Sequence, residues 1–305
     1  MRYIHCACGT DLRLPGTEHH QLPAVPARKD LRFLDDVAAE CLPEDPTPSL
    51  AEIQAMPDVR HLGAPQPAPQ QPDEALRVIV SGTDAALGAV LTRIMRGDYL
   101  WAEVAFLPAD PASPAAVCWG VPARADTAAA FAMEAPVVPA ACVRNDTGDV
   151  LAGSATLYRG DGTEEFVGEI VVDSQTLLYN ERPTARFSGQ FGARLVPTMD
   201  APGIACVPLT TPITTAGPAS RRSPEQLEWL SATPGLRWLA RGKSAPAALA
   251  DASRALTGRA VQAGGEGISL LLDATVKPRT LTRSAFYRHL RDIQSVRNAE
   301  NAPMC

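Results

Sequence analysis

One stretch, LRVIVSGTDAALGAVLTRIMRG at residues 76–97, constrains the fold of this chain more than any other. It opens with a short apolar run typical of a buried strand, and Ser81–Asp84 then form a turn that supplies helix-capping oxygens. Beyond the turn, apolar residues recur at helical spacing: Leu87, Val90, Leu91, Ile94 and Met95. A second apolar run at 102–107 predicts another strand. Strand, turn, amphipathic helix and strand make one βαβ unit, which implies a parallel sheet.

The chain before this unit carries weaker signals. A helix is expected at about 29–42, and a second helix is expected to begin at Thr47. Residues 61–74 (HLGAPQPAPQQPDE) are rich in Pro and Gln, which is typical of a linker. We therefore interpret residues 1–75 as an N-terminal extension with a linker, and residues 76–135 as a small α/β domain of the nucleotide-binding kind.

From about residue 135 the pattern changes to short β-type runs separated by turn residues. Residues 187–195 alternate between apolar and polar side chains, as a half-buried antiparallel strand does. The runs at 259–263 and 268–273 flank the sequence Gly-Gly-Glu-Gly, which predicts a hairpin. Residues 136–280 are therefore interpreted as an antiparallel, β-sandwich-like domain.

Helical patterns return in the later part of the chain. Helices are expected to open at Ser223 and near Ser244, within the β-rich part. A last helix is expected over roughly 282–297, with arginines on its polar side. A basic amphipathic helix of this kind can lie on an anionic membrane, but more often its apolar face packs on its own domain. Residues 281–305 are accordingly interpreted as a C-terminal helix that packs back on the protein.

Composition narrows the class of protein. At 305 residues the chain is long enough for about two domains of ~150 residues each, and 46% of its residues are hydrophobic. No window approaches the ~18 continuous apolar residues that span a bilayer, and the N-terminus lacks the apolar region of a secretory signal. The seven scattered cysteines indicate reduced thiols, so we expect a cytoplasmic protein without a transmembrane segment. The net charge of −6 offers no general attraction to nucleic acid.

The strongest candidate site is the turn formed by Ser81, Gly82, Thr83 and Asp84. A turn between a parallel strand and a helix places backbone N–H groups at the positive end of the helix dipole, where phosphate binds. The alternative is a capped turn without a ligand, because one glycine is few for a phosphate loop. Both interpretations stay open on the sequence.

Two other motifs have simpler explanations. The sequence Gly-Asp-Gly-Thr at 160–163 lies between two strand-like runs, so it predicts an exposed hairpin tip. Cys6 and Cys8 lie near several histidines, but they lack the second matching pair that a zinc site needs. We therefore expect no metal site from the sequence.

Over residues 76–297 the chain resembles the diacylglycerol kinase/lipid kinase family, which is related to the NAD kinases. The resemblance is best in VIVSGTDAALGAVL (78–91), which stands where the family has a strand, the motif GGDGT and a helix. It is fair in GRAVQAGGEGISLLLDATV (258–276), which resembles the late hairpin of the family, ending in Asp-Gly-Glu. The resemblance implies a two-domain fold whose interdomain cleft takes ATP and Mg²⁺.

The same alignment shows three departures from the family's motifs. Only Gly82 of the GGDGT motif keeps its place, and the second phosphate loop becomes Leu-Pro-Ala-Asp-Pro at 107–111, without glycine. The final Asp-Gly-Glu becomes Asp273-Ala274-Thr275, which lacks the glutamate that serves phosphoryl transfer in the family. Phosphoryl transfer depends on positioning and on charge stabilisation, so these losses remove much of its machinery.

The sequence thus favours a non-catalytic or weakly active relative of lipid and NAD kinases that binds a nucleotide or another phosphate-bearing ligand in the interdomain cleft. The alternative is a divergent ATP- and Mg²⁺-dependent kinase that phosphorylates a lipid or a small hydroxyl acceptor. In either case the expected partners are small molecules, a nucleotide or a lipid, and not nucleic acid.

Overall fold

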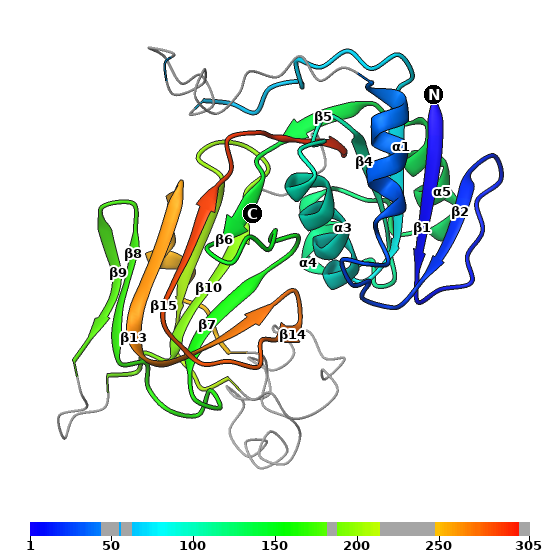
Figure 1. The fold of residues 1–305 in the computed structure, drawn as a ribbon. Coiled ribbons are helices and arrows are strands. Elements are labelled where there is room, and N and C mark those ends of the chain that lie inside the picture. The colour runs from blue at the N-terminus through cyan, green and yellow to red at the C-terminus, as the bar shows by residue number, and fades with distance from the viewer. Residues whose placement is uncertain (44–54, 56–62, 182–187, 214–247, 299–305) are drawn as a thin grey trace.

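The computed structural model describes residues 1–43, 55, 63–181, 188–213 and 248–298. Two domains lie side by side (Figure 1): one is built on a mainly parallel sheet with helices, and the other on a large antiparallel sheet. The helices α3 and α4 lie between the two sheets. This confirms the fold class expected from the sequence, an α/β domain combined with an antiparallel β domain.

The sheet of the α/β domain has six strands in the order β2-β1-β3-β4-β16-β5. All neighbouring strands in it run parallel except β5, which pairs antiparallel with β16. The strands are β1 (Arg2–Cys8), β2 (Glu18–Leu22), β3 (Leu76–Gly82), β4 (Glu103–Pro108), β5 (Val137–Ala140) and β16 (Ile293–Val296).

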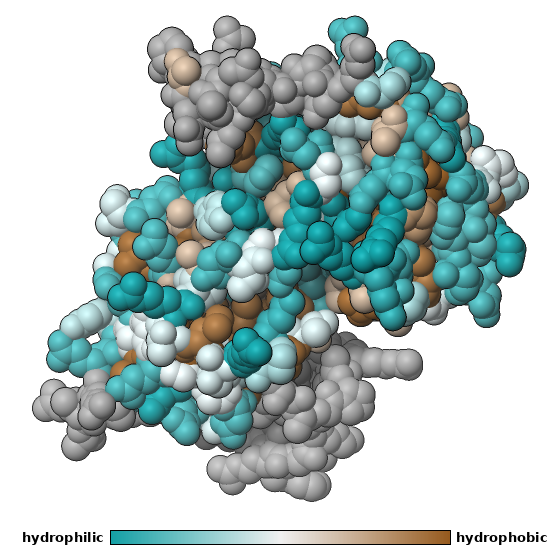
Figure 2. All heavy atoms as spheres, in the orientation of Figure 1, coloured by the Kyte–Doolittle hydropathy of each residue, from teal (hydrophilic) through white to brown (hydrophobic). Residues whose placement is uncertain are grey.

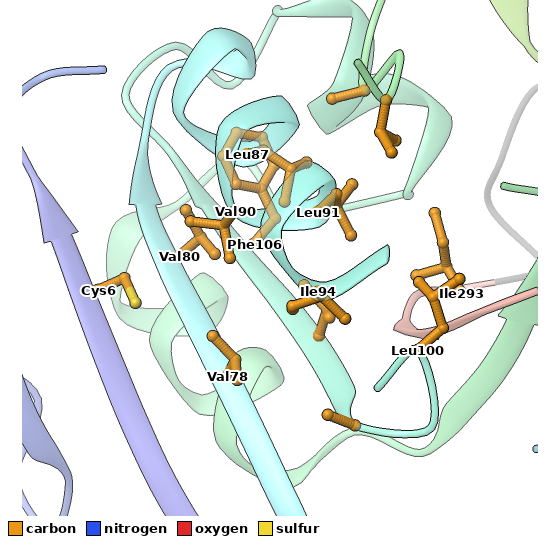
Figure 3. Close-up of a cluster of buried hydrophobic side chains, with 14 of the residues drawn as sticks. Cys6, Val78, Val80, Leu87, Val90, Leu91, Ile94, Leu100, Phe106 and Ile293 are labelled. Atoms are coloured by element: carbon orange, nitrogen blue, oxygen red, sulfur yellow. The ribbon is translucent and has the colours of Figure 1, made fainter. Parts of the chain in front are cut away.

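Helices cover both faces of this sheet. The helices α1 (Phe33–Cys41) and α3 (Asp84–Arg96) pack on one face, and α5 (Ala125–Glu134) packs on the other. The short helix α4 (Pro114–Cys118) follows β4. Figure 3 shows the apolar side of α3 against the sheet, and its labelled contacts are Leu87, Val90, Leu91 and Ile94 over Val78, Val80 and Phe106. Each such side chain stabilises the fold by roughly 1.5–3 kcal/mol through burial.

The βαβ unit predicted from residues 76–107 is present. Every residue of β3 is buried, and the strand pairs in parallel with β4. The Thr83 hydroxyl caps α3 by accepting a hydrogen bond from the backbone N–H of Ala86 at 3.3 Å. The helix runs to Arg96 and ends at Gly97, where the sequence places its stop.

The β domain contains a sheet in the order β12-β11-β10-β7-β13-β15-β6, with the β8–β9 hairpin and β14 attached through β13. Its strands are β6 (Val143–Asn145), β7 (Ala155–Arg159), β8 (Gly168–Val172), β9 (Gln175–Asn180), β10 (Gly192–Pro197), β11 (Ile204–Leu209), β12 (Leu256–Gly258), β13 (Ala260–Leu272), β14 (Thr275–Val276) and β15 (Leu281–Arg288). A one-turn 3-10 helix, η2 (Ala252–Arg254), precedes β12.

Two of the predicted boundaries are wrong. Residues 1–75 are not a separate extension, because β1 and β2 are strands of the α/β sheet and β1 pairs directly with β3. The histidine and cysteines of β1 gave it no clear strand pattern, although its last five residues are buried. The β domain also does not begin at 136, since β5 belongs to the parallel sheet.

The predicted C-terminal helix is also wrong. Residues 281–288 form β15 and residues 293–296 form β16, so the region 281–298 contains strands. The apolar residues Phe286, Leu290 and Ile293 fit a helical spacing, but β15 finds partners on both sides in β13 and β6. Pairing with residues distant in sequence therefore outweighs the local pattern. Residues 299–305 lie outside the described part.

Details of the β-rich region differ in a similar way. The expected hairpin around Gly264–Gly267 is one continuous strand, β13, with a register shift between Gly264 and Ile268. The turn at 160–163 is exposed at Asp161, as predicted, but β7 pairs with β10 and β13 and not with β8. The helices expected at Thr47, Ser223 and Ser244 lie outside the described residues.

The connections between the two domains lie side by side. In the described residues the chain crosses between the domains twice, from β5 to β6 and from β15 to β16. The crossings lie together, because the N–H of His289 donates to the carbonyl of Cys142 at 2.7 Å.

No helix in the described part is long and apolar enough to cross a membrane. Hydrophilic side chains cover much of the face in Figure 2, with smaller hydrophobic patches on both domains.

Candidate functional site

The turn after β3 is packed tightly against its neighbours. The Ser81 hydroxyl is buried and lies 2.7 Å from Nε2 of His5. Gly82 has a φ of +149°, and a Cβ there would lie 2.9 Å from the carbonyl oxygen of Cys8. The Gly82 carbonyl accepts a hydrogen bond from the N–H of Ala109 at 2.7 Å. The sequence therefore places glycine where the backbones of two strands approach closely, and phosphate binding by this turn stays a prediction.

Asp84, the last residue of the candidate turn, is buried at the start of α3. One of its carboxylate oxygens accepts a hydrogen bond from the backbone N–H of Ala115 at 3.1 Å, at the beginning of α4. The other, Oδ1, has no hydrogen-bond partner among the described residues. Burial raises the pKa of Asp84, against the hydrogen bonds from Ser113 and Ala115. The side chain thus ties α3 to α4.

Asp273 is a buried carboxylate that the backbone holds in place. Its two oxygens accept hydrogen bonds from the backbone N–H groups of Ala152, Gly153 and Ser154 at 3.1, 2.8 and 3.0 Å. Burial nevertheless raises its pKa to about 7, with a further contribution from the charge of Asp84. The Gly153 backbone lies so close to Asp84 that a Cβ there would collide with it. The Gly153 segment therefore separates the two carboxylates.

A cavity of about 230 Å³ lies beside these residues, between the two domains. Its walls come from the segment before α1, from α3 and from the β domain: Val25, Pro26, Arg28, Leu31, Ala85, Gly88, Ala89, Thr92, Arg93, Arg96, Asp149, Val150, Leu272, Asp273, Thr275 and Lys277. The charged side chains among them are four cations and two carboxylates. None of Ser81, Gly82, Thr83 and Asp84 lines it, although the next residue, Ala85, does.

The cations of the cavity come from both domains. Arg96 of α3 donates to the carbonyls of Thr147 and Gly148 at 2.8 and 3.1 Å, and it lies 3.5 Å from the carboxylate of Asp149. Lys277 of the β domain lies 2.8 Å from the same carboxylate. Arg93 is paired with Asp35, and Arg28 is exposed at the mouth.

This set of side chains suits a phosphate group and does not suit a divalent metal. Arginine and lysine bind phosphate through charge-assisted hydrogen bonds. Mg²⁺ needs open carboxylate or phosphate oxygens, whereas Asp273 is bonded to backbone N–H groups and Asp149 to cations. In the described part of the chain, no group of three or more His, Cys, Asp or Glu side chains could hold a metal ion.

Comparison with known proteins identifies the fold. No protein-family model matches the chain, and no curated protein matches it in sequence. Two solved structures from Bacillus anthracis str. Sterne, a diacylglycerol kinase and a putative diacylglycerol kinase, match with TM-scores of 0.54 and 0.55 at 10% identity. Each match covers 98% of this chain and 97% of the other. An NAD kinase from Archaeoglobus fulgidus in complex with ATP is more distant, with a TM-score of 0.42 at 7% identity over 74% of this chain and 79% of that chain.

The protein therefore has the two-domain fold of diacylglycerol kinase-like proteins. The resemblance inferred from residues 78–91 and 258–276 is confirmed at the level of the fold. Both stretches contribute to the walls of the cavity, the first through α3 and the second through the turn after β13.

Sequence reasoning missed the cations of the cavity. Arg28, Arg96 and Lys277 come from three distant segments, so no local motif joins them. One signal was available, because lysine is rare in this chain and Lys277 stands two residues after the Asp-Ala-Thr sequence that resembles a family motif.

Proposed function

We propose that the protein binds a phosphate-bearing small molecule, with a nucleotide such as ATP as the first candidate, in the cavity between its domains, and that it transfers no phosphoryl group. The observation that carries the proposal is the meeting of Arg96 from one domain and Lys277 from the other at one cavity, while Asp84 and Asp273 are buried.

The hydrogen-bonding capacity of the two cations supports phosphate binding. Arg96 uses its Nε and Nη2 groups for backbone carbonyls, which leaves the Nη1 donors of its guanidinium for a ligand. Lys277 has three donors, of which one bonds to Asp149. Ligand pockets commonly measure roughly 300–1,000 Å³, so a cavity of about 230 Å³ suits the phosphate end of a nucleotide, with the remainder at the mouth.

The residues of the same cavity are evidence against phosphoryl transfer. Transfer of a phosphoryl group needs metal ions and fixed donors around a charge-spread transition state. Thr275 stands where the kinase motif has its glutamate, and Asp273 holds three backbone N–H groups. Binding can therefore persist without catalysis.

Thermal unfolding with ATP, ADP, NAD and inorganic phosphate, each with and without Mg²⁺, tests the binding. A ligand at 100 times its Kd stabilises the folded state by about 2.7 kcal/mol. We expect Arg96→Gln and Lys277→Gln to weaken this stabilisation, whereas Arg124→Gln, on an arginine 80% exposed and away from the cavity, serves as the matched control. Equal ligand response in all four proteins would refute the proposed site.

The alternative function, an ATP- and Mg²⁺-dependent kinase, has one observation in its favour. Asp273 lines the cavity with a pKa of about 7, near the value of an efficient general base at neutral pH. Radiolabelled ATP with diacylglycerol, a panel of other lipids and NAD as acceptors tests it directly. We expect no transfer; turnover that Asp84→Ala and Gly82→Trp both abolish would establish the kinase and refute a non-catalytic role.

A further inference from the structure

The carboxylate of Asp149 lies between the two cations that the proposed function assigns to phosphate. Its Oδ2 is 2.8 Å from Nζ of Lys277, and its Oδ1 is 3.5 Å from Nη2 of Arg96. All three side chains line the cavity. The anion position of the cavity is thus taken by a group of the protein itself.

The loop that presents Asp149 is held mainly by Asn145, and the Asp149 carboxylate adds only a longer contact with the Thr147 hydroxyl at 3.4 Å. The buried Asn145 side chain accepts hydrogen bonds from the N–H of Asp149 and the hydroxyl of Thr147, both at 2.8 Å. The N–H of Asn145 donates to the carbonyl of Asp149 at 2.9 Å. Loss of the Asp149 charge would therefore leave the loop in place.

Arg96 also keeps its position without Asp149. Arg96 is held by the carbonyls of Thr147 and Gly148, which belong to the same loop. The three charged side chains are 29% to 41% exposed, and ion pairs in such surroundings contribute little to stability. A ligand phosphate with a larger charge can displace a carboxylate bound this weakly.

From this geometry we infer, on the basis of the proposed function, that Asp149 is a built-in competitor for the anion site of the cavity. A phosphate that bridges Lys277 and Arg96 takes the position that the Asp149 carboxylate occupies between them, so it must displace that carboxylate. The competition selects for a terminal phosphate, which carries close to two negative charges, over a carboxylate or a phosphodiester. Asp149 thereby sets both the affinity and the charge preference of the site.

The magnitude follows from Coulomb's law. In water, the attraction between two unit charges 4 Å apart changes an equilibrium constant about fivefold, and at a protein surface the change is larger. Asp149→Asn removes the charge and keeps the shape of the side chain, so we expect it to tighten the binding of ADP about tenfold. The gain should shrink as salt is added, because partly exposed charges are screened.

Titration calorimetry with ADP and, separately, AMP methyl ester tests the inference on the full chain. The expected result is tighter ADP binding by Asp149→Asn, a smaller gain for the diester, and no change for Asp126→Asn, a control on an exposed carboxylate paired with Arg124. In the background Lys277→Gln the gain should largely disappear.

The outcomes separate the two claims. If the unaltered protein binds ADP and Asp149→Asn binds it equally or more weakly, the competitor role is overturned while the proposed function stands. If neither protein binds ADP or inorganic phosphate at millimolar concentration, the proposed function fails and the inference fails with it.

Discussion

Gly88 on α3 lies close to the β domain, so its replacement by alanine tests the contact between the domains. A Cβ at this position would lie 2.8 Å from Oδ2 of Asp273 and 3.2 Å from the carbonyl oxygen of Val150. Alanine in a helix interior is otherwise favoured over glycine by about 1 kcal/mol. Whether Gly88→Ala raises or lowers the free energy of unfolding therefore depends on whether the Asp273 carboxylate can move away from the new methyl group.

The hydrogen bonds of Asp273 decide whether Gly88→Ala stabilises or destabilises the folded protein. Three backbone N–H groups hold this carboxylate, so a shift that admits the new methyl group weakens at least one of them. A buried backbone N–H that loses its hydrogen-bond partner costs about 1–3 kcal/mol, which exceeds the gain in helix propensity. We expect Gly88→Ala to lower the free energy of unfolding by about 1–2 kcal/mol.

Urea unfolding followed by tryptophan fluorescence measures this change. Gly264→Ala is the control, because a Cβ there would meet no atom within 4 Å. In the background Asp273→Ala the penalty of Gly88→Ala should shrink, since contacting residues couple. A Gly88→Ala protein that is as stable as the parent, or more stable by about 1 kcal/mol, would show that the domains do not constrain each other at this point.

The remaining predictions concern titrating groups. Burial lowers the pKa of His5 to about 4, so its neutral form stabilises the fold above its unfolded pKa of about 6.5, and up to about 3 kcal/mol is lost as the pH falls toward 4. Urea unfolding at pH 7 and pH 5 should show this loss, and His5→Gln should reduce the slope. Burial raises the pKa of Asp273 to about 7. The contribution of its neutral form to the free energy of unfolding is therefore greatest below pH 3.8 and is lost as the pH rises to 7. Asp273→Asn should make the free energy of unfolding depend less on pH between pH 5 and 8. Iodoacetamide should react slowly with Cys8, Cys142 and Cys206 in the folded protein and quickly in urea, because burial raises the pKa of each of these thiols to about 12. Rapid labelling of these thiols without urea would contradict their burial.

Local patterns predicted the part of the fold that local contacts build. The unit of β3, α3 and β4 spans residues 76–108, and its strand run, capping Thr83 and stop at Gly97 all lie within one continuous stretch. The signals in this stretch agree with one another, which is why its helix and strands were predicted with small errors at the ends.

Long-range pairing explains most of the errors. The strand β15 lies between β13 and β6, and β16 lies between β4 and β5, so partners far away in sequence fix both segments as strands. Their helical spacing of apolar residues carried no information about these partners. The strand β1 was missed for the same reason, since the run Arg2–Cys8 mixes polar and apolar residues and finds β2 and β3 beside it.

The candidate site was also predictable from the sequence only in the part that local structure builds. The turn at Ser81–Asp84 could be located from its sequence, because the turn and the helix that follows it are local structures. The cavity could not, because its cations Arg28, Arg96 and Lys277 meet only when both domains are assembled.

The two interdomain crossings have a mechanical consequence. A single linker would let one domain rotate in any direction. Two connections joined by the His289–Cys142 hydrogen bond instead act as a hinge with one axis. The domains can then separate only by bending about the line of these connections. Such bending would part α3 from the β domain, so Arg96 and Lys277 would move apart and the space between them would widen. The width of the cavity is therefore tied to the angle between the two domains.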